Sequence, residues 1–371
     1  MKNKWIALIL LLLCYSCDNK QDKNEQGNYY VPTNAHGFQI DTMKHSYVLR
    51  IKDPWQGANG VEYTYTIGQF GYQPQSHDSI ALPVRRVVCM STSHSSFIES
   101  LDEGNSIVGM SGKYSYSPFI QSKFDSEEIV DVGNDYHLNY EKLLALRPDV
   151  IFVYGVDKEF QATAIKLKKL GFKLIFIGDY LEETPLGKSE WRIVFSLFYD
   201  KIQRAIVEHN QLAQRYNVLK SLVTDVSNRP KVMMNTPFNE VWYLPGNRNY
   251  ISHYIIDAGA KFVYTTKNQR ESYPIPYESA IKDARKADFW LNVGTFTSLD
   301  QIRRQLNRFG NIPAVKERKV YNNNKRRTPQ NGSDFWESGA VHPDLVLEDL
   351  IRIFHPSSLP LDTLHFYHQL L

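Results

Sequence analysis

Aromatic, hydroxyl and basic side chains follow the apolar segments that predict β-strands in this sequence. Such side chains supply hydrogen bonds, rigid contact area and positive charge, which suit the binding of a ligand better than its conversion. In open α/β sheets, ligands bind outside the carboxyl ends of the strands. We therefore predict ligand contacts from the residues at those ends, and together they suit a large ligand that is partly anionic and partly planar. These residues are Ser93, His94, Tyr114, Tyr154, Phe238, Trp242, Arg326, Arg327 and Trp336.

The sequence lacks the common catalytic motifs and so does not favour an enzyme. The sequence contains no G-x-S-x-G element, no H-E-x-x-H element and no Walker glycine loop. Ser93 and His94 are neighbours in sequence, and adjacent residues rarely reach the geometry of a nucleophile and its base. We predict no catalytic residue, no metal site formed by the protein and no intrinsic cofactor.

The overall charge gives no indication of a nucleic-acid partner. The formal net charge is +3, and the densest basic run is Lys325-Arg326-Arg327. Three basic residues are more typical of a solvated loop than of a nucleic-acid interface.

The N-terminus predicts an exported, lipid-anchored protein. Basic residues in 1–4 precede an apolar stretch at 5–13, and Cys14-Tyr15-Ser16-Cys17 follows. This pattern resembles a bacterial lipoprotein signal, with cleavage before Cys17 and lipid attached to its sulfur. Cys14 would leave with the signal and the Cys17 sulfur would carry the lipid, so Cys89 would be the single free thiol of the mature chain, which excludes an internal disulfide. An ordinary secretory signal is the alternative, and the membrane that would hold the anchor stays open.

The elements that must position the ligand residues alternate between strand and helix patterns. Apolar runs at 86–90, 107–110, 150–155 and 173–178 alternate with helical patterns, and the same theme returns after residue 230. Alternating units of this length predict parallel sheets. The fold class is therefore α/β, with two lobes and a ligand cleft between them.

A long helix is expected to join the two lobes. Residues 188–229 contain no Gly and no Pro, and their apolar residues recur with a period of 3.6. Asp200 and Gln203 fit a capping box, which predicts a short helix near 188–199 and a long one near 201–226. The predicted organisation is a signal at 1–17, a tether at 18–28, a β extension at 29–80, an N-terminal lobe at 81–186, backbone helices at 187–228 and a C-terminal lobe at 229–371. We expect the extension to add edge strands to the first lobe.

Two glutamates occupy matching places in the two lobes. Glu141 and Glu278 each lie in the first turn of a predicted helix that leads into a strand. On residue chemistry alone, each carboxylate is best explained by the positive end of the helix dipole.

The order of these motifs resembles the periplasmic binding proteins for iron–siderophore complexes, haem and cobalamin. Val87-Val88, Ser91-Thr92 and 107–111 are followed by the Asn-Tyr-Glu…Arg-Pro-Asp-Val-Ile element at 139–151. The resemblance covers roughly residues 84–355. Segments 321–324 and 332–344 resemble the Bacteroidetes lipoprotein branch of that family.

The resemblance implies a function in import. It implies a monomeric, membrane-anchored periplasmic protein that carries a metal chelate to an ABC permease–ATPase complex in the inner membrane. A ferric siderophore is the predicted ligand, with cobalamin or haem as alternatives, and a surface lipoprotein that binds a protein or glycan is the alternative of another class. In cobalamin-binding relatives one glutamate on each lobe docks on the permease, and Glu141 and Glu278 match those positions.

Overall fold

A computed structural model describes residues 29–69, 79–134, 137–155, 158–360 and 362–371. The predicted signal, lipidation site and tether, which end at residue 28, lie outside the described residues. In the part of the chain that is described, every helix is too short or too polar to cross a bilayer.

The N-lobe is built on a five-stranded parallel sheet. Its central strand is β5, with β6 and β7 on one side and β8 and β9 on the other, so the chain changes direction beside β5. Its strands and helices are β5 (Val87–Cys89), α1 (Thr92–Glu99), β6 (Ile107–Met110), α2 (Pro118–Asp125), β7 (Val130–Asp131), α3 (Tyr140–Leu146), β8 (Val150–Val153), α4 (Lys158–Lys169) and β9 (Leu174–Phe176).

The C-lobe contains a second five-stranded sheet in the order β13-β10-β15-β16-β17, in which only the last pairing among the described strands is antiparallel. A three-stranded antiparallel sheet, β11-β12-β14, lies in the same lobe. The elements are β10 (Lys231–Met234), β11 (Pro237–Phe238), β12 (Val241–Leu244), α8 (Tyr250–Asp257), β13 (Lys261–Phe262), β14 (Tyr273–Pro276), α9 (Tyr277–Ala284), β15 (Phe289–Leu291), α10 (Leu299–Gln305), α11 (Pro313–Lys316), β16 (Val320–Asn322) and β17 (His368–Gln369).

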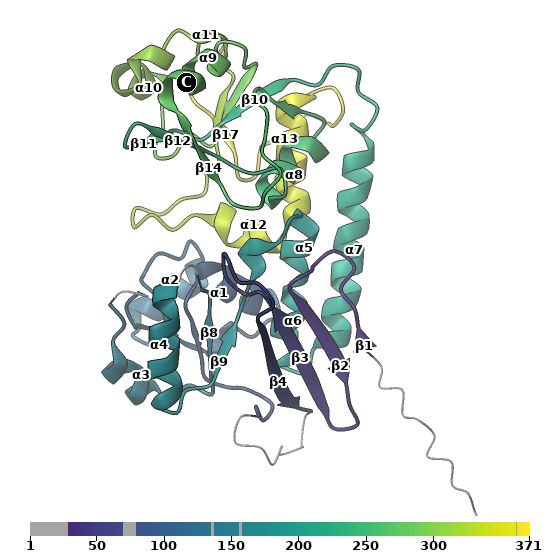
Figure 1. Ribbon diagram of the computed structural model, residues 1–371, viewed down its shortest axis with the longest axis vertical. Coiled ribbons are helices and arrows are strands. Elements are labelled where there is room, and N and C mark those ends of the chain that lie inside the picture. The colour runs from purple at the N-terminus through teal and green to yellow at the C-terminus, as the bar shows by residue number, and fades with distance from the viewer. Residues whose placement is uncertain (1–28, 70–78, 135–136, 156–157, 361) are drawn as a thin grey trace, which may run out of the picture.

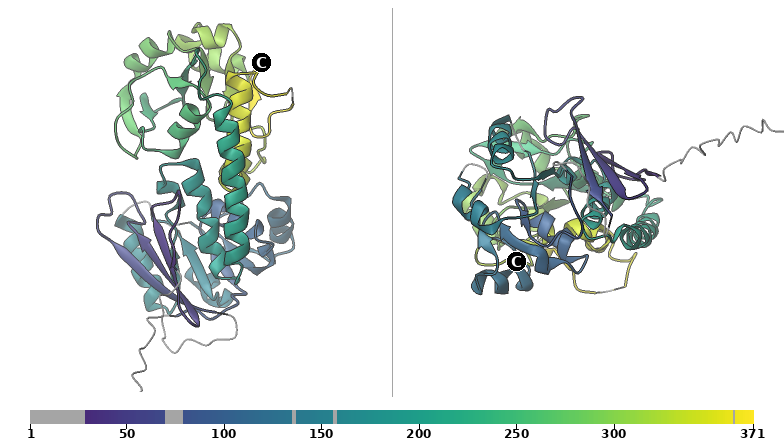
Figure 2. Two further views of the ribbon diagram at one scale, coloured as in Figure 1. Left: turned by 90° about the vertical axis from the view of Figure 1, so that its right-hand side faces the viewer. Right: turned by 90° about the horizontal axis from the view of Figure 1, so that it is seen from below.

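Helices join the lobes. After α5 (Pro185–Glu190) and α6 (Arg192–Leu197), helix α7 (Ile202–Ser221) runs along both lobes (Figure 2). It packs against α6 at the N-lobe and against α13 (Pro343–Phe354) at the C-lobe. The short helix α12 (Ser338–Val341) lies between the lobes (Figure 1). The predicted long helix is therefore confirmed, although it is shorter than expected, with 20 residues and a length of about 30 Å.

The predicted capping box at Asp200 is wrong. Residue Lys201 precedes the first turn of α7 and makes no side-chain cap. Asp200 instead adopts a left-handed conformation with φ of 54°, and its carboxylate accepts a hydrogen bond from the Tyr47 hydroxyl at 3.3 Å. Asp200 therefore binds Tyr47 of the N-terminal extension and does not cap α7.

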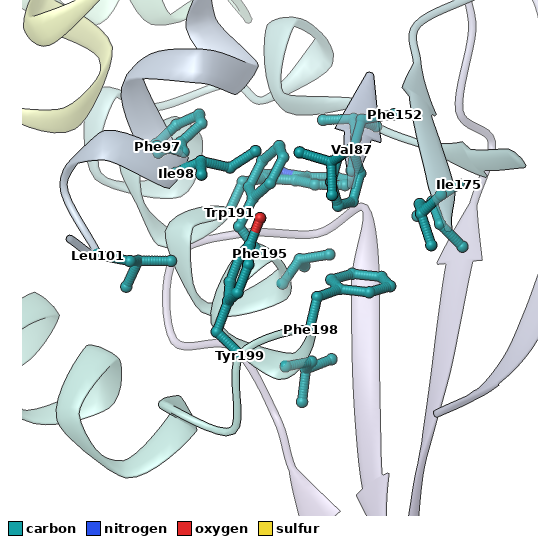
Figure 3. Packing of buried hydrophobic residues seen from close by; sticks show 14 of the residues in the cluster. Val87, Phe97, Ile98, Leu101, Phe152, Ile175, Trp191, Phe195, Phe198 and Tyr199 are labelled. Atoms are coloured by element: carbon teal, nitrogen blue, oxygen red, sulfur yellow. The ribbon is translucent and has the colours of Figure 1, made fainter. Parts of the chain in front are cut away.

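The core of the N-lobe is filled by the segment that precedes α7. Figure 3 shows Phe195 and Phe198 packed between α1 and the sheet. The ring of Phe195 lies 5.3 Å from that of Phe97 and 4.8 Å from that of Phe152. Because all of these rings are buried, the joining helices are part of the N-lobe core and hold its sheet firmly.

The N-terminal extension forms a sheet of its own. Strands β1 (Tyr29–Tyr30), β2 (Phe38–Thr42), β3 (Ser46–Lys52) and β4 (Glu62–Gly68) pair in an antiparallel meander. The expectation of edge strands on the first lobe is therefore wrong. Alternate residues such as Leu49 and Ile51 are fully buried, and a sheet with one apolar face must cover that face against another layer. The purple sheet in Figure 1 accordingly lies against the N-lobe and α6.

Two buried carboxylates, one in α5 and one in the segment that precedes it, hold the extension in place. Glu190 of α5 accepts hydrogen bonds from the backbone N–H groups of Asn34 and Ala35 at 2.8 and 2.7 Å. Glu182 accepts from the backbone N–H groups of His36 and Gly37 at 2.9 and 3.0 Å. Buried carboxylates need such partners, so these contacts make the extension one body with the N-lobe.

Candidate functional site

A cavity of about 600 Å³ lies between the two lobes. The carboxyl ends of β10, β15 and β16 form its C-lobe side, which is where ligands bind in open α/β sheets. The segment between β16 and α12 lies between the lobes and adds a further side (Figure 1). The lining residues used below are Gln56, Tyr180, Leu181, Asn235, Arg248, Asn249, Tyr250, Arg270, Glu271, Asn292, Asn323, Asn324, Arg327, Asn331 and Trp336.

Asparagines are the commonest lining residue of this cleft. Six of them face it among the described residues, and each carboxamide can both donate and accept hydrogen bonds. Asn235 and Asn292 directly follow β10 and β15 and adopt left-handed conformations, with φ of 68° and 55°. Asparagine tolerates this conformation better than most residues, so its presence there allows both strands to turn sharply at the cleft.

Three arginines make the cleft cationic. Arg248 and Arg270 belong to the C-lobe, and the Nε atom of each donates to the same oxygen of Glu183, at 3.0 Å in both cases. Burial alone would raise the pKa of Glu183, but hydrogen bonds and positive charge from the two arginines lower it. Arg327 donates to the side chain of Asn331. With Glu271 also lining the cleft, three guanidinium groups face two carboxylates.

Glu183 connects the lobes across the cleft. It lies in the segment between β9 and α5, while both of its arginine partners lie beyond α7. Both arginines bind Glu183 through the Nε edge of the guanidinium group. The other N–H groups of each guanidinium are chemically suited to bind a second anion. The arrangement can therefore hold the lobes together while it presents positive charge to a ligand.

Aromatic side chains supply flat contact area in the same cleft. Tyr180, Tyr250 and Trp336 line it. Trp336 is 45% exposed and packs perpendicular to Phe335, with 4.8 Å between ring centroids. Burial raises the pKa of Tyr250, so this tyrosine remains protonated and able to donate.

Of the predicted ligand residues, Arg327 and Trp336 line the cleft. Tyr154 does not line it, although its ring lies 6.5 Å from that of the lining residue Tyr180. Tyr114 and Phe238 are exposed but do not line this cavity.

Arg326 faces away from the cleft, into a separate cavity of about 260 Å³. There its Nε atom pairs with Asp334 at 2.5 Å, and its guanidinium lies over the ring of Tyr116. Its neighbour Arg327 forms an isolated antiparallel bridge with Ser333 and lines the ligand cleft, which Arg326 does not.

The prediction for Trp242 is contradicted. Its side chain is fully buried in the C-lobe core, and its indole N–H donates to the backbone oxygen of Met234 at 2.9 Å. Alternate residues of β12 are buried, so Trp242 and Leu244 face the core while Tyr243 is exposed. The aromatic residue at this strand was recognised in the sequence, but its face was not.

Ser93 and His94 are buried and do not line the cleft. His94 is fully buried, and both of its ring nitrogens lack a hydrogen-bond partner within the described structure. Burial lowers the pKa of His94 to about 4, which keeps the imidazole neutral. Asp179 and Lys188 form a buried ion pair nearby, with 2.5 Å between Oδ2 and Nζ. Ser93 and His94 are therefore corrected from ligand contacts to buried residues of α1 in the N-lobe.

Several residues that line the cleft were not predicted from the sequence. Arg248 and Arg270 come together only through tertiary contacts, and no local pattern joins them to Glu183. Asn235 and Asn292 carried a usable signal, because each asparagine directly follows an apolar strand. Within the described residues, no group of three or more His, Cys, Asp or Glu side chains is placed to hold a metal ion.

The comparisons with known proteins agree with this architecture. A family model described as "Periplasmic binding protein" matches residues 200–326. An uncharacterized lipoprotein of Methanocaldococcus jannaschii is 29% identical over 300 residues, which cover 78% of this chain and 69% of that protein.

Solved structures show the same fold at low identity. A possible iron-binding periplasmic solute-binding protein of Staphylococcus epidermidis aligns with a TM-score of 0.57 and 16% identity, covering 74% of this chain and 99% of that chain. A periplasmic heme binding protein of Pseudomonas aeruginosa aligns with a TM-score of 0.58 and 17% identity, covering 77% of this chain and 98% of that chain. The fold is that of a class III periplasmic binding protein.

In this periplasmic binding fold, the two predicted docking glutamates lie at exposed helix starts. Glu141 is exposed in the first turn of α3, which Asn139 caps through a hydrogen bond to the backbone N–H of Lys142 at 3.0 Å. Glu278 is exposed in the first turn of α9 and forms two hydrogen bonds with Arg308, at 2.5 and 2.7 Å. Their docking role remains a prediction.

Proposed function

We propose that this protein is the solute-binding component of an ABC importer. Anchored to a membrane through Cys17, it captures an anionic metal chelate of the ferric siderophore class in the interlobe cleft. It then delivers the chelate to a permease–ATPase complex in the inner membrane. The proposal assigns coordination of the iron to the chelator, so that the protein recognises the outside of the complex.

The observation that carries the proposal is the cationic, amide-rich lining of the cleft. Arginine forks bind carboxylate-type oxygens through paired hydrogen bonds, and Arg248, Arg270 and Arg327 all line the cavity. The asparagine carboxamides can match the further donors and acceptors of a chelate. Trp336 offers a flat apolar surface for its planar parts.

This lining favours a hydrophilic chelate over haem. A haem site usually supplies an axial His or Tyr beside the macrocycle, and His94 is fully buried and does not line the cleft. Tyr180 and Tyr250 do line the cavity. Haem binding is therefore a defined outcome of the experiment that follows, as is cobalamin binding.

The test is a fluorescence titration of the soluble chain that begins after Cys17. The probes are ferric citrate, a ferric tris-hydroxamate siderophore, cobalamin and haemin, with correction for inner-filter absorption. We expect saturable quenching by a ferric chelate, because Trp336 lies in the cleft and is 45% exposed. Saturation by haemin or cobalamin alone would overturn the siderophore assignment, and no saturation by any probe would contradict the proposal.

A charge-removal variant identifies the cleft as the site. Charge-assisted hydrogen bonds contribute about 1.5–3 kcal/mol each, so replacing Arg248 and Arg270 together with Ala is expected to raise Kd at least about tenfold. Arg303→Ala is the matched control. Arg303 and Arg248 have the same side-chain exposure, 47%, but Arg303 pairs with Asp300 on α10, away from the cleft lining. Equal effects of the two variants would refute the assignment of this cleft.

A further inference from the structure

The loop between β3 and β4 of the extension covers the binding edge of the N-lobe. Trp55 forms a parallel bridge with Gly155, which lies just beyond β8. A Cβ atom on Gly155 would lie 3.1 Å from the Cβ of Trp55, and one on Gly178, just beyond β9, would lie 3.6 Å from the Cα of Pro54. The loop therefore sits against the carboxyl ends of both strands, where an open α/β sheet receives its ligand.

The loop is held in one conformation by its own contacts. The side chain of Trp55 is 9% exposed, and its ring lies 5.7 Å from the ring of Phe176 in β9 and 6.0 Å from that of Tyr63 in β4. Asp53 accepts a hydrogen bond from the backbone N–H of Val61 at 2.9 Å, and its own backbone N–H donates to the backbone oxygen of Val61 at 2.8 Å. These contacts fix the loop, and they therefore also fix the position of the residue that follows Trp55.

That next residue is Gln56, and it lines the ligand cleft. Among the described lining residues, only Gln56, Tyr180 and Leu181 come from the chain before α5. The N-lobe side of the cleft is thus shared between the segment after β9 and the extension. Tyr180 is tied to the same region, because its hydroxyl donates to the backbone oxygen of Gly155, the residue that Trp55 bridges.

We infer that the loop at residues 53–60 is a third wall of the cleft and selects ligands by size and polarity through Gln56. This inference rests on the proposed function, because it takes the interlobe cleft as the ligand site. The carboxamide of Gln56 donates to and accepts from the bound chelate, opposite the arginines and asparagines of the C-lobe. A bulky side chain at position 56 narrows the cleft from the N-lobe side.

The loop itself provides a matched control. Gln56 and Asn59 are both exposed carboxamides of the same loop, but Asn59 does not line the cavity. The soluble chain after Cys17 is prepared as wild type, Gln56→Trp, Gln56→Ala and Asn59→Trp. Each is titrated with ferric citrate, a ferric tris-hydroxamate siderophore, cobalamin and haemin, and its thermal unfolding is compared with that of the wild type.

We expect Gln56→Trp to raise the Kd of the bound chelate at least tenfold. The increase in Kd should be greater for the larger hydroxamate complex than for ferric citrate. Gln56→Ala should weaken binding roughly fivefold through the loss of a hydrogen bond, and this variant decides the question if the tryptophan variant does not fold. Asn59→Trp should stay within about twofold of the wild type, as expected for a surface change.

The outcomes distinguish a failure of the role inferred for Gln56 from a failure of the proposed function. A wild type that binds a probe while both Gln56 variants keep its Kd within twofold would overturn the third wall and leave the proposed function intact. Equal weakening by Asn59→Trp would also overturn it, because the effect would not be specific to the cleft. A wild type that binds none of the probes would overturn the proposed function, and the inference with it.

Discussion

The attachment of the extension depends on one buried carboxylate, and its removal is a sharp test of the structure. Glu190 is fully buried. One of its oxygens accepts from the Tyr30 hydroxyl and from the backbone N–H of Thr33 at 2.9 Å. The other accepts from the backbone N–H groups of Asn34 and Ala35 at 2.8 and 2.7 Å. Burial and the neighbouring carboxylate raise the pKa of Tyr30, so this hydroxyl keeps its proton and donates.

Glu190→Gln keeps the size of the side chain but turns one acceptor into a donor. If the new NH₂ group takes the position of the second oxygen, it faces two backbone N–H groups that no longer have an acceptor. Hydrogen bonds to charged groups contribute about 1.5–3 kcal/mol each, so two of them account for about 3–6 kcal/mol of unfolding free energy. The opposite orientation of the amide loses the tyrosine and Thr33 contacts instead, with a similar cost.

The assay is guanidinium unfolding, with hydrogen exchange of residues 30–37 as a local readout. Glu62→Gln is the control, because Glu62 is 45% exposed and only 3.9 Å from Arg50, and such pairs contribute about 0–1 kcal/mol. We expect fast exchange at residues 33–37 and a loss of about 3–6 kcal/mol of unfolding free energy for Glu190→Gln. A loss below about 1 kcal/mol, or one equal to that of the control, would refute the reasoning.

Two further predictions concern pH and uptake. Burial raises the pKa of Glu337 to about 7, against hydrogen bonds from Ser115 and Tyr116 that lower it. The protonated Glu337 should therefore stabilise the fold by up to about 3 kcal/mol below pH about 4.5, and this contribution should be lost as the pH rises through about 7. In Glu337→Gln, the unfolding free energy should depend less on pH between 4.5 and 8 than in the wild type. An unchanged slope in the variant would contradict this. Replacing Glu141 and Glu278 together with Ala should abolish uptake in cells at unchanged ligand Kd, whereas a weakened Kd would refute a docking role.

The elements of this fold were largely readable from local patterns. A long joining helix was predicted within residues 188–229, and Glu141 and Glu278 were predicted in the first turns of helices, where they lie in α3 and α9. Both depend on contacts within a few residues, namely helical periodicity and a side chain that reaches the first turn. The error at Asp200 has the opposite origin, because its partner Tyr47 lies 153 residues away in sequence.

The sequence by itself determined the class of fold, the long joining helix and the strand ends at which a ligand site would form. It did so because apolar periodicity and turn residues act over short distances. Only the tertiary structure decided which side chains reach the cleft. A strand signal does not say which face meets the core, so Trp242 was misplaced. The pairing of Glu183 with Arg248 and Arg270, and the approach of Gln56 to the cleft, join segments far apart in the chain, and such contacts exist only once the lobes and the extension have packed together.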